Sequence, residues 1–320
     1  MVLSGAVRDL NEYTLGDWAT GTPVVHGFKR VRNIAVDRYF RASKRRDYER
    51  AMATLSGSAG QPLVIMISFN TPWALDLSTR LALRNLKAKL VVCDNSRDRA
   101  ARREIERMCR DRGVSYIALP FNPEWNPCRS HGIALNWVYY NVVLPLRPEI
   151  FAFLDHDLLL THELDPVRAL GDQPLFGIRR DSRWGWYLWP GFCMYRLSAL
   201  SNYIVDFNTD IPRELDTGGR NWLAVYRHLE RDRLKFATRG SVRLRVGDGL
   251  PAWPVETIDD HLHILGVSFG DRRPALGDKS FFNAIVRHVE QGGTPSDLLA
   301  SSPGEVTDPG RVGAGAVRPD

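Results

Sequence analysis

The segment FLDHD, residues 153–157, carries the side chains with the clearest chemistry, and it overlaps the end of an apolar run at 150–154. In an extended chain, side chains two residues apart share a face, so we expect Asp155 and Asp157 to project together and His156 to point away. Two close carboxylates at the mouth of a buried strand repel each other unless a cation lies between them. Carboxylate oxygens suit Mg²⁺ or Mn²⁺, which would in turn bind the oxygens of a diphosphate. The alternative is that both aspartates are strand-ending turn residues or a helix cap.

A second group of residues with chemical potential lies at 179–196, RRDSRWGWYLWPGFCMYR, where two arginines precede several tryptophans. Aromatic faces are platforms for the C–H surfaces of sugars, and arginine can neutralise phosphate. The competing interpretation is core packing, which we expect for about half of these aromatic side chains.

The elements that must position these residues alternate in type from Pro62 onward. Short β-rich apolar runs predict four strands, at 63–67, 90–93, 114–119 and 150–154, and the intervening patterns predict helices at 77–86, 97–112 and 133–146. Strands separated by helices imply right-handed crossovers and an α/β fold with a mostly parallel central sheet, covered by helices on both faces. Ligands on such sheets bind beyond the carboxyl ends of the strands. Those ends are therefore where we expect the chemistry.

The rest of the chain divides into three parts by composition. Residues 1–60 are predicted to be a helical extension with a charged helix at 37–55, and residues 61–291 are predicted to form one principal domain. Within its second half we expect strand-like pieces at 184–189 and 192–195 and helices at 221–229 and 279–290. Residues 292–320 are rich in Gly, Pro, Ser and Asp and are predicted to be a disordered tail, because burial cannot offset the entropy of ordering them.

Several short segments, taken in order, resemble the GT-A glycosyltransferase fold, in particular its family 2 type of inverting enzymes. VIMISFN at 64–70 resembles the first strand and its turn, and VVCDNS at 91–96 resembles the end of the second strand, which holds the base and ribose. SHGIALNWVYY at 130–140 is similar to the entry into the helix before the metal strand, and FLDHD matches the D-x-D motif. The resemblance covers about residues 63 to 269. It implies a GT-A type sheet with a small mixed subregion on the acceptor side.

The resemblance implies a donor site built from the first two strand ends, with Ser68, Asn70, Asp94 and Ser96 as contacts. Asp94 follows a buried strand and could accept from a uracil imide or from ribose hydroxyls, although an Asx-turn role remains open. Asp155 would also contact the donor.

The helix entry adds two further candidates for the donor site. Gly132 permits close backbone approach at a helix start, where free amides favour phosphate. Asn136 lies one turn farther on, where a satisfied core amide is the alternative role.

The resemblance also implies a catalytic base and further metal ligands. LDTGGRNW at 215–222 matches the place of an acidic residue near the acceptor, so Asp216 is the candidate general base, with Glu214 as its substitute. The alternative for Asp216 is capping of the following helix. In HLHILG at 261–266, His263 is the preferred histidine for closing the metal site, and His261 shares its face.

The resemblance places two acceptor contacts in the aromatic segment. Pro190, Gly191 and Phe192 resemble the acceptor-side loop of the family, so Trp189 and Gly191 are the candidate contacts. The substrates implied are a nucleotide-sugar donor and a saccharide, lipid-linked or small-molecule acceptor.

Composition excludes some other classes of protein. Lys plus Arg number 43 against 37 acidic residues, a net charge of +6 that is dispersed along the chain, so we expect no nucleic-acid partner. The most Arg-dense stretch, 97–112, places Ala101, Ile105 and Met108 at helical spacing and reads as a solvated helix face. No apolar run reaches the roughly 18 residues of a membrane span and no secretory signal is evident, so we expect no transmembrane segment and a cytoplasmic location. The four cysteines show no C-x-x-C spacing and are expected to be reduced thiols.

Two other functions fit parts of the pattern. A nucleotidyltransferase also combines a parallel sheet with acidic metal ligands, but it usually has a Gly-rich signature with a basic residue after the first strand, where this chain has SFNTPWALD. A non-catalytic nucleotide- or sugar-binding protein is the other alternative. The leading hypothesis is a Mn²⁺- or Mg²⁺-dependent glycosyltransferase that uses a UDP- or dTDP-linked sugar.

Overall fold

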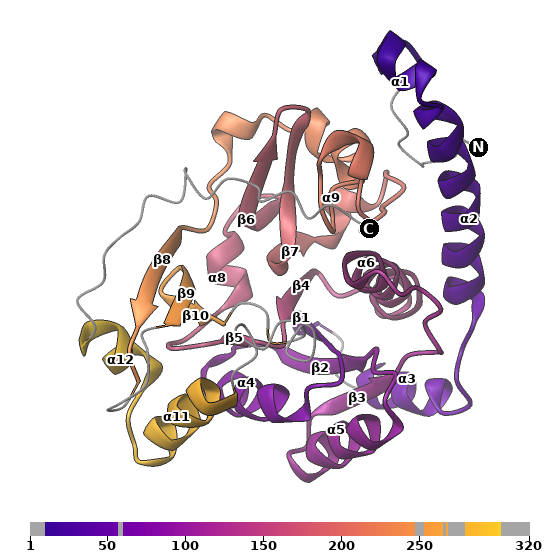
Figure 1. Cartoon of the computed structure of the whole chain (residues 1–320). Coiled ribbons are helices and arrows are strands. Elements are labelled where there is room, and N and C mark those ends of the chain that lie inside the picture. Colours follow the sequence, from indigo (N-terminus) through magenta and orange to yellow (C-terminus); the bar gives the residue numbers. More distant parts are fainter. Residues whose placement is uncertain (1–9, 57–59, 247–252, 265–266, 268–278, 302–320) are drawn as a thin grey trace. The chain divides into compact units, whose positions relative to one another are not determined.

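The computed structural model describes residues 10–56, 60–246, 253–264, 267 and 279–301 (Figure 1). Within these residues the chain forms two compact units, each assembled from separate stretches. Unit 1 comprises residues 1–72, 87–156 and 165–236, and unit 2 comprises residues 73–86, 157–164 and 237–320. The chain therefore passes between the units five times, and one of these passages falls between His156 and Asp157.

Unit 1 is built on a six-stranded sheet with the order β3-β2-β1-β4-β7-β6. The first four strands in that order are parallel, while β7 runs antiparallel to both β4 and β6. Its strands are β1 Leu63–Ser68, β2 Lys89–Asp94, β3 Ser115–Ala118, β4 Ile150–Asp155, β6 Leu175–Ser182 and β7 Gly185–Arg196. The α/β class and the mostly parallel sheet predicted from the sequence are confirmed.

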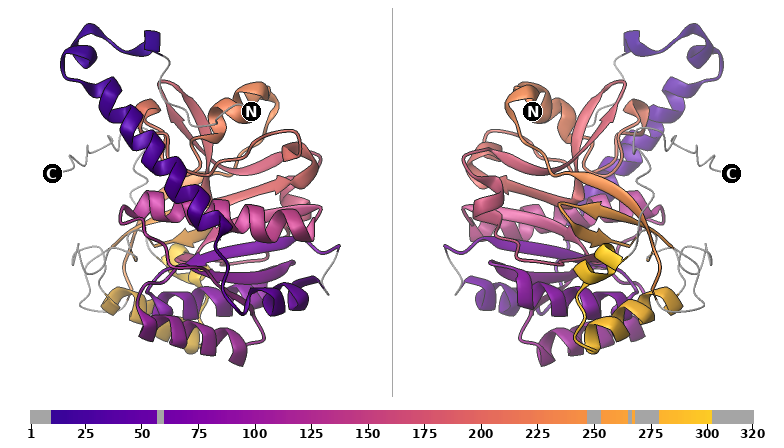
Figure 2. Two further views of the ribbon diagram at one scale, coloured as in Figure 1. Left: turned by 90° about the vertical axis from the view of Figure 1, so that its right-hand side faces the viewer. Right: turned by 90° about the vertical axis from the view of Figure 1, so that its left-hand side faces the viewer.

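The central strands of this sheet are apolar up to their carboxyl ends because helices cover both of their faces. All six residues of β1 are buried, as are the first five of β4. This is the continuous apolar pattern of a parallel strand between two layers. Figures 1 and 2 show α5 (Arg99–Asp111) on one face of the sheet and α6 (Pro127–Val138) on the other.

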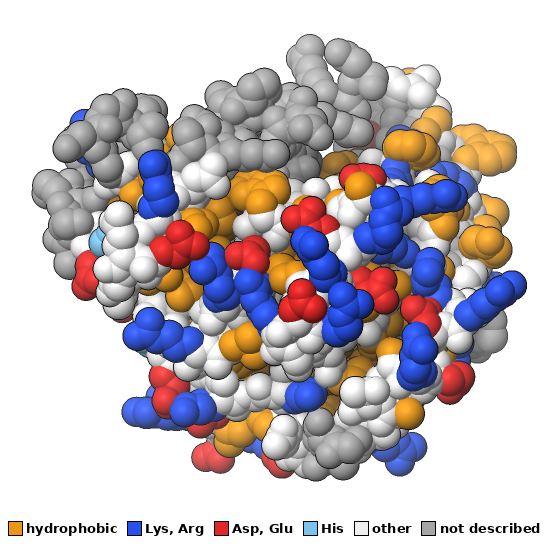
Figure 3. Space-filling model, turned by 90° about the horizontal axis from the view of Figure 1, so that it is seen from below, with side chains coloured by type: hydrophobic (Ala, Val, Ile, Leu, Met, Phe, Trp, Pro, Cys, Tyr) orange, Lys and Arg blue, Asp and Glu red, His pale blue; other side chains and the backbone are white. Residues whose placement is uncertain are grey.

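The Arg-rich stretch forms the amphipathic helix α5, as predicted. Ala101, Ile105 and Cys109 are buried, and the Asp98 side chain caps the helix by accepting from the amides of residues 100 and 101. On the face drawn in Figure 3, basic side chains are interspersed with acidic ones. The other helices of unit 1 are α1 Leu15–Ala19, α2 Thr22–Ala42, α3 Tyr48–Ser56, α7 Leu144–Leu146, α8 Pro166–Leu170, α9 Leu197–Leu200 and α10 Asn221–Ala224.

Residues 10–56 pack against the core of unit 1 and do not form a separate extension. Phe40, Tyr48 and Leu55 belong to the main hydrophobic core of unit 1. The Trp137 indole donates to the Ser43 carbonyl at 2.8 Å. The Tyr48 hydroxyl donates to the Asn141 carbonyl, just beyond α6, at 2.6 Å. No unit boundary falls at residue 60, and the single helix expected at 37–55 is two helices, α2 and α3. Residues 1–9 and 57–59 lie outside the described part of the chain.

Unit 2 has its own four-stranded sheet, with the order β5-β10-β9-β8 and antiparallel pairing. Its elements are α4 Pro72–Asn85, β5 Leu158–Leu159, β8 Arg239–Leu244, β9 Trp253–Ile258, β10 His261–His263, α11 Lys279–Glu290 and α12 Pro295–Ser301. A separate hydrophobic core joins one face of this sheet to all three helices. The sequence predicted α11 but neither β8 nor β9.

The start of the predicted tail is ordered, which corrects the expectation for residues 295–301. Helix α12 begins after a reciprocal cap, in which the Thr294 amide donates to the Asp297 carboxylate and the Asp297 amide donates to the Thr294 hydroxyl. Leu298 is only 6% exposed and joins the core of unit 2. Residues 302–320 lie outside the described part. Among the helices that the structure describes, none combines the length and the apolar character that crossing a bilayer requires.

Candidate functional site

The carboxyl ends of three neighbouring strands of unit 1 meet at one edge of the sheet. Ser68 at the end of β1 is in register with Asp94 at the end of β2. On its other side, Ile67 is in register with Asp155 at the end of β4. Three of the side chains chosen from the sequence therefore lie along a single sheet edge, as parallel pairing requires.

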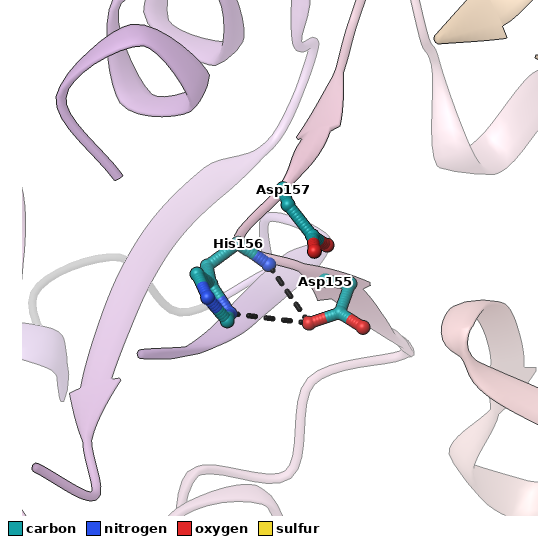
Figure 4. Close-up of side chains that lie close together, drawn as sticks. All are labelled: Asp155, His156 and Asp157. Atoms are coloured by element: carbon teal, nitrogen blue, oxygen red, sulfur yellow. Dashed lines mark hydrogen bonds and ion pairs between the residues drawn. The ribbon is translucent and has the colours of Figure 1, made fainter. Parts of the chain in front are cut away.

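The acidic motif lies where β4 ends (Figure 4). Strand β4 stops at Asp155, and His156 and Asp157 form a turn. One ligand atom from each of Asp155, His156 and Asp157 falls within 4.8 Å of the others. The Asp155 Oδ1 accepts from the His156 amide at 3.0 Å and lies 3.2 Å from its Nδ1. His156 therefore does not point away, because the alternation of an extended strand ends one residue earlier than assumed.

Asp157 faces a histidine and a second carboxylate within unit 2. Its Oδ1 lies 3.4 Å from the His263 Nε2, while the His263 Nδ1 lies 2.9 Å from the Glu256 Oε2. All three residues are buried, with at most 5% of each exposed. The amide of residue 264 donates to the Asp157 carbonyl at 3.2 Å, which holds this turn beside β10.

This arrangement suits a divalent cation. If His263 donates its Nδ1 proton to Glu256, its Nε2 presents a lone pair to the Asp157 Oδ1. That oxygen is buried and accepts no hydrogen bond from any described residue. Two facing acceptors require a proton or a cation, and adjacent ligands about 2.1 Å from an octahedral metal lie about 3 Å apart. The donor set of carboxylate oxygens and one imidazole suits Mn²⁺ or Mg²⁺.

Glu256 is the residue that the sequence reasoning missed. Its second carboxylate oxygen accepts from the Arg239 Nε at 2.9 Å, which fixes the carboxylate on β9. Glu256 and His263 pair directly across β9 and β10. Without the strand β9 and its register, nothing in the sequence brings a glutamate seven residues upstream to this histidine.

His261 contacts a different group of residues. Its Nδ1 accepts from the Thr161 amide at 3.3 Å, and its ring stacks on the His162 ring with centroids 4.2 Å apart. Burial, followed by the neighbouring His162, lowers the pKa of His261 to about 3. The imidazole is therefore neutral at physiological pH, and it contacts Thr161 and His162, the residues that follow β5.

The residues proposed for the donor base and ribose form one hydrogen-bonded cluster. Asp94 is fully buried and accepts from the Ser96 amide at 2.8 Å, the Tyr116 hydroxyl at 2.9 Å and the Ser68 hydroxyl at 3.3 Å. The Asn70 amide donates to the Ser96 hydroxyl at 2.8 Å, and the Asn70 side-chain oxygen accepts from the amide of Arg97 at 2.9 Å. The Asp94 carboxylate thus orders the loops after β1 and β2.

Gly132 and Asn136 of α6 meet protein atoms rather than an open space. A Cβ on Gly132 would lie 2.9 Å from the Cα of Asn208, so the residue permits close approach of another backbone segment. The Asn136 amide donates to Asp206 at 2.8 Å and to Asp37 at 3.0 Å, while its oxygen accepts from the Phe207 amide at 2.7 Å. These contacts match the satisfied core amide that the sequence analysis left open for Asn136.

Asp216 is exposed and does not cap the next helix. Helix α10 begins at Asn221, and its N-cap is Arg220 without a side-chain hydrogen bond. The Asp216 Oδ1 accepts from the Thr217 amide at 2.7 Å. Glu214 has a positive φ of 58° and its carboxylate pairs with Arg183 at 2.7 Å. The capping alternative for Asp216 is therefore excluded.

Asp216 also influences a thiol at the start of α6. The Thr217 hydroxyl donates to the Cys128 carbonyl at 3.1 Å, which ties the two segments together. Burial, together with the charge and hydrogen bond of Asp216, raises the pKa of the Cys128 thiol to about 12. All four cysteines are free, as predicted.

The two acceptor candidates lie on β7 close to the end of β4. Phe192 pairs with Leu154, so Gly191 and Asp155 follow at the same end of the two strands. A Cβ on Gly191 would lie 2.0 Å from the Trp189 ring, so only glycine lets this indole fold back over the strand. The segment bearing Asp216 reaches the same strand, because a Cβ on Gly218 would lie 2.8 Å from the Leu188 carbonyl.

No protein-family model and no curated protein sequence matches this chain. Solved structures with a limited likeness to this chain include the following two. A mannosyltransferase, PcManGT from Pyrobaculum calidifontis in complex with GDP-Man and Mn²⁺, is 12% identical over 59% of this chain and 59% of its own, with a TM-score of 0.38. TarS of S. aureus is 15% identical over 46% of this chain and 30% of its own, with a TM-score of 0.32. Likeness at this level supports no assignment of activity to this chain.

Proposed function

We propose that this chain is a metal-dependent glycosyltransferase that transfers a sugar from a nucleotide-diphosphate donor, such as a UDP- or dTDP-sugar, to an acceptor hydroxyl with inversion. One observation carries the proposal. The ligand atoms of Asp155, His156 and Asp157 cluster at the carboxyl edge of a mostly parallel sheet, and His263 faces the Asp157 oxygen that lacks a hydrogen bond. The order of the motifs along the sequence supports the same assignment.

In this proposal, Asp155 and Asp157 hold Mn²⁺ or Mg²⁺ with His263, and Glu256 orients His263 through its Nδ1. When bound, the metal would neutralise charge on the departing diphosphate. Ser68, Asn70, Asp94 and Ser96 would shape the base and ribose pocket through their loops. Their protein hydrogen bonds favour a role in positioning backbone groups over direct contact by the Asp94 carboxylate.

Asp216 is the proposed general base that removes the proton of the acceptor hydroxyl. Its exposure and the absence of a capping role leave the carboxylate available for a reaction with substrate. The segment after it contacts β7 close to Trp189 and Gly191, which we propose as acceptor contacts. The Trp189 ring is partly exposed, with the Arg180 guanidinium 5.6 Å from its centroid, and we propose that this pair contacts a saccharide, lipid-linked or small-molecule acceptor.

A donor assay with the full chain tests the proposal. The chain is incubated with UDP-, dTDP- and GDP-sugars, with and without Mn²⁺, and the released nucleotide product is measured. We expect metal-dependent release of nucleoside diphosphate that the variant Asp157→Asn loses and the exposed control Asp172→Asn retains. Release of pyrophosphate from a nucleoside triphosphate would instead identify a nucleotidyltransferase. Tight nucleotide binding without any product would identify a non-catalytic binding protein.

A further inference from the structure

The outward side of α2 carries a continuous apolar stripe. Val24, Phe28, Val31, Ala35 and Tyr39 recur at spacings of three and four residues, which places them on one face of the helix. Phe28 is 76% exposed, Val31 68%, Tyr39 67% and Val24 57%. The stripe is about 22 Å long at 1.5 Å per residue. An apolar stripe at helical spacing normally faces a core, and this one faces solvent.

The opposite side of α2 packs against the rest of unit 1. Phe40 is fully buried in the main core, and the Asp37 carboxylate accepts from the Asn136 and Asn208 amides. Figures 1 and 2 show the N-terminal end of α2, with α1, extending away from the sheet of unit 1. Leu15 and Trp18 of α1 continue the exposed apolar surface, with 90% and 47% exposure.

Positive charge borders this stripe. Residues 22–46 contain eight Lys and Arg side chains and one acidic residue, Asp37, which is turned into the protein. Lys29 and Arg38 are exposed on α2, whereas Arg32 is 53% exposed and pairs with the buried Glu124 at 2.8 Å. Exposed basic residues follow α2 directly at 44, 45 and 46, and Arg45 lies 3.6 Å from Asp47. The apolar surface therefore has a cationic margin with no exposed carboxylate of its own helix.

Charge selects among the possible occupants of this surface. A second copy packed stripe to stripe would bring the two basic margins together, and the one acidic side chain of α2, Asp37, is turned into the protein and does not offset them. An amphipathic peptide needs a groove with walls on both sides, whereas α2 presents a single convex helix. A helix with apolar side chains on one face and Lys or Arg beside them lies in the plane of an anionic bilayer surface.

We propose that α2, together with α1, docks this protein on the surface of membranes that contain anionic lipids. The apolar stripe would enter the boundary between head groups and acyl chains, and the basic margin would contact the lipid phosphates. Trp18 suits this boundary because indole rings concentrate there. The proposal is independent of the proposed function, since it uses no residue of the strand-edge site.

The test is flotation of the full chain with vesicles of phosphatidylcholine alone or mixed with about one-third phosphatidylglycerol, an anionic lipid. We expect binding only to the anionic vesicles, weakened by about 0.5 M NaCl because the Debye length falls to about 4 Å. The double variant F28E/V31E should bind at least about tenfold more weakly. V167E is the matched control, because Val167 is 49% exposed on α8 and its replacement should leave vesicle binding unchanged.

A second pair of variants isolates the contribution of charge. K29Q/R38Q should lower binding and reduce its salt dependence, whereas R103Q/R107Q on α5 removes two exposed arginines elsewhere and should do neither. Absence of binding to anionic vesicles overturns the proposal, as does equal binding by wild type and F28E/V31E. Self-association by light scattering that F28E/V31E abolishes, without vesicle binding, would make the stripe an interface between copies and would also overturn it.

Discussion

At the scale of single residues, Asp157 and Asp94 differ in how their buried oxygens are satisfied. The Asp94 carboxylate accepts from two hydroxyls and one backbone amide. The Asp157 Oδ1 accepts no hydrogen bond from the described residues and faces the His263 Nε2. A buried carboxylate without donors costs free energy unless a cation binds it. Asp94 therefore stabilises the loops around it, whereas Asp157 is suited to a ligand.

Replacing Asp157 by Asn should consequently separate metal binding from folding. Without metal, we expect the melting temperature of Asp157→Asn to equal or exceed that of the wild type, because a buried charge is removed. With Mn²⁺, the wild type should gain stability by mass action, about 2.7 kcal/mol at a hundredfold excess over Kd, and the variant should gain little. Differential scanning fluorimetry measures both. An equal Mn²⁺ effect in the two proteins would remove Asp157 from the metal site.

Glu256 should act on the metal only through His263. We expect Glu256→Gln to weaken Mn²⁺ binding by about 10- to 100-fold, the usual effect of losing the partner that orients a ligand histidine. Arg239→Gln is the matched control, since it removes the other partner of Glu256 and leaves the contact with His263 in place. Isothermal titration calorimetry with Mn²⁺ distinguishes them. Equal weakening in both variants would mean that Glu256 merely stabilises the strand pair.

Asp216→Asn should abolish transfer without unfolding the chain, because Asn cannot take a proton and Asp216 caps no helix. We expect a fall of about 10²- to 10⁴-fold in turnover, with nucleotide affinity unchanged. The Cys128 thiol supplies an independent readout, since loss of the Asp216 charge should lower its pKa and speed its alkylation at mildly alkaline pH. Full activity in Asp216→Asn, with loss in Glu214→Gln, would move the base to Glu214.

The sequence predicted the acidic motif and the histidine because their chemistry is local to a few residues. FLDHD ends a run of buried residues, and this placement is visible without a structure. The contact between Glu256 and His263 depends on the register of β9 and β10, which no short pattern specifies. The loss of strand alternation after Asp155 was likewise not visible, because it depends on where pairing with β1 ends.

At the scale of secondary structure, the sequence predicted the buried strands correctly and missed strands with exposed polar residues. Strands β1, β2 and β4 are apolar except at their ends and were found in the sequence, whereas β6 reads LFGIRRDS and was missed. Strand β6 lies at the edge of its sheet, where charged residues are common and one side of the backbone has no partner strand. The two pieces expected around Pro190 are one strand, β7, which pairs with β6 on both sides of the proline and with β4 after it.

The short helix α12 tests how much a small buried contact stabilises an element that composition predicted to be disordered. Leu298 lies in the same hydrophobic core as Phe281 and Ile285 of α11. We expect Leu298→Ala to lower the free energy of unfolding by about 2 kcal/mol, the lower end for a buried leucine, because the helix is short and peripheral. Chemical denaturation measures this, with the exposed Ser296→Ala as control. An effect below about 0.5 kcal/mol would show that α12 does not dock.

At the scale of the whole molecule, the two units are interleaved in sequence rather than joined by one linker. The segment 157–164 leaves unit 1 at the acidic motif, supplies β5 to unit 2 and returns. Asp155 therefore belongs to unit 1, while Asp157, His263 and Glu256 belong to unit 2. Three of the four residues proposed to bind or orient the metal therefore lie in unit 2.

This distribution makes a prediction about where Mn²⁺ alone stabilises the protein. We expect hydrogen exchange to slow most in β5, β9 and β10, whose residues carry or adjoin Asp157, Glu256 and His263. The slowing should approach a factor of 100 at a hundredfold excess over Kd, because exchange through metal-free open states is suppressed by the same mass action that stabilises the fold. Peptides from α5 and β3, at the far edge of the unit 1 sheet, should change less. In Asp157→Asn, Mn²⁺ should no longer slow exchange more in β5, β9 and β10 than in α5 and β3. Uniform slowing across both units would instead indicate that the chain opens only as a whole, and slowing confined to α5 and β3 would place the metal elsewhere.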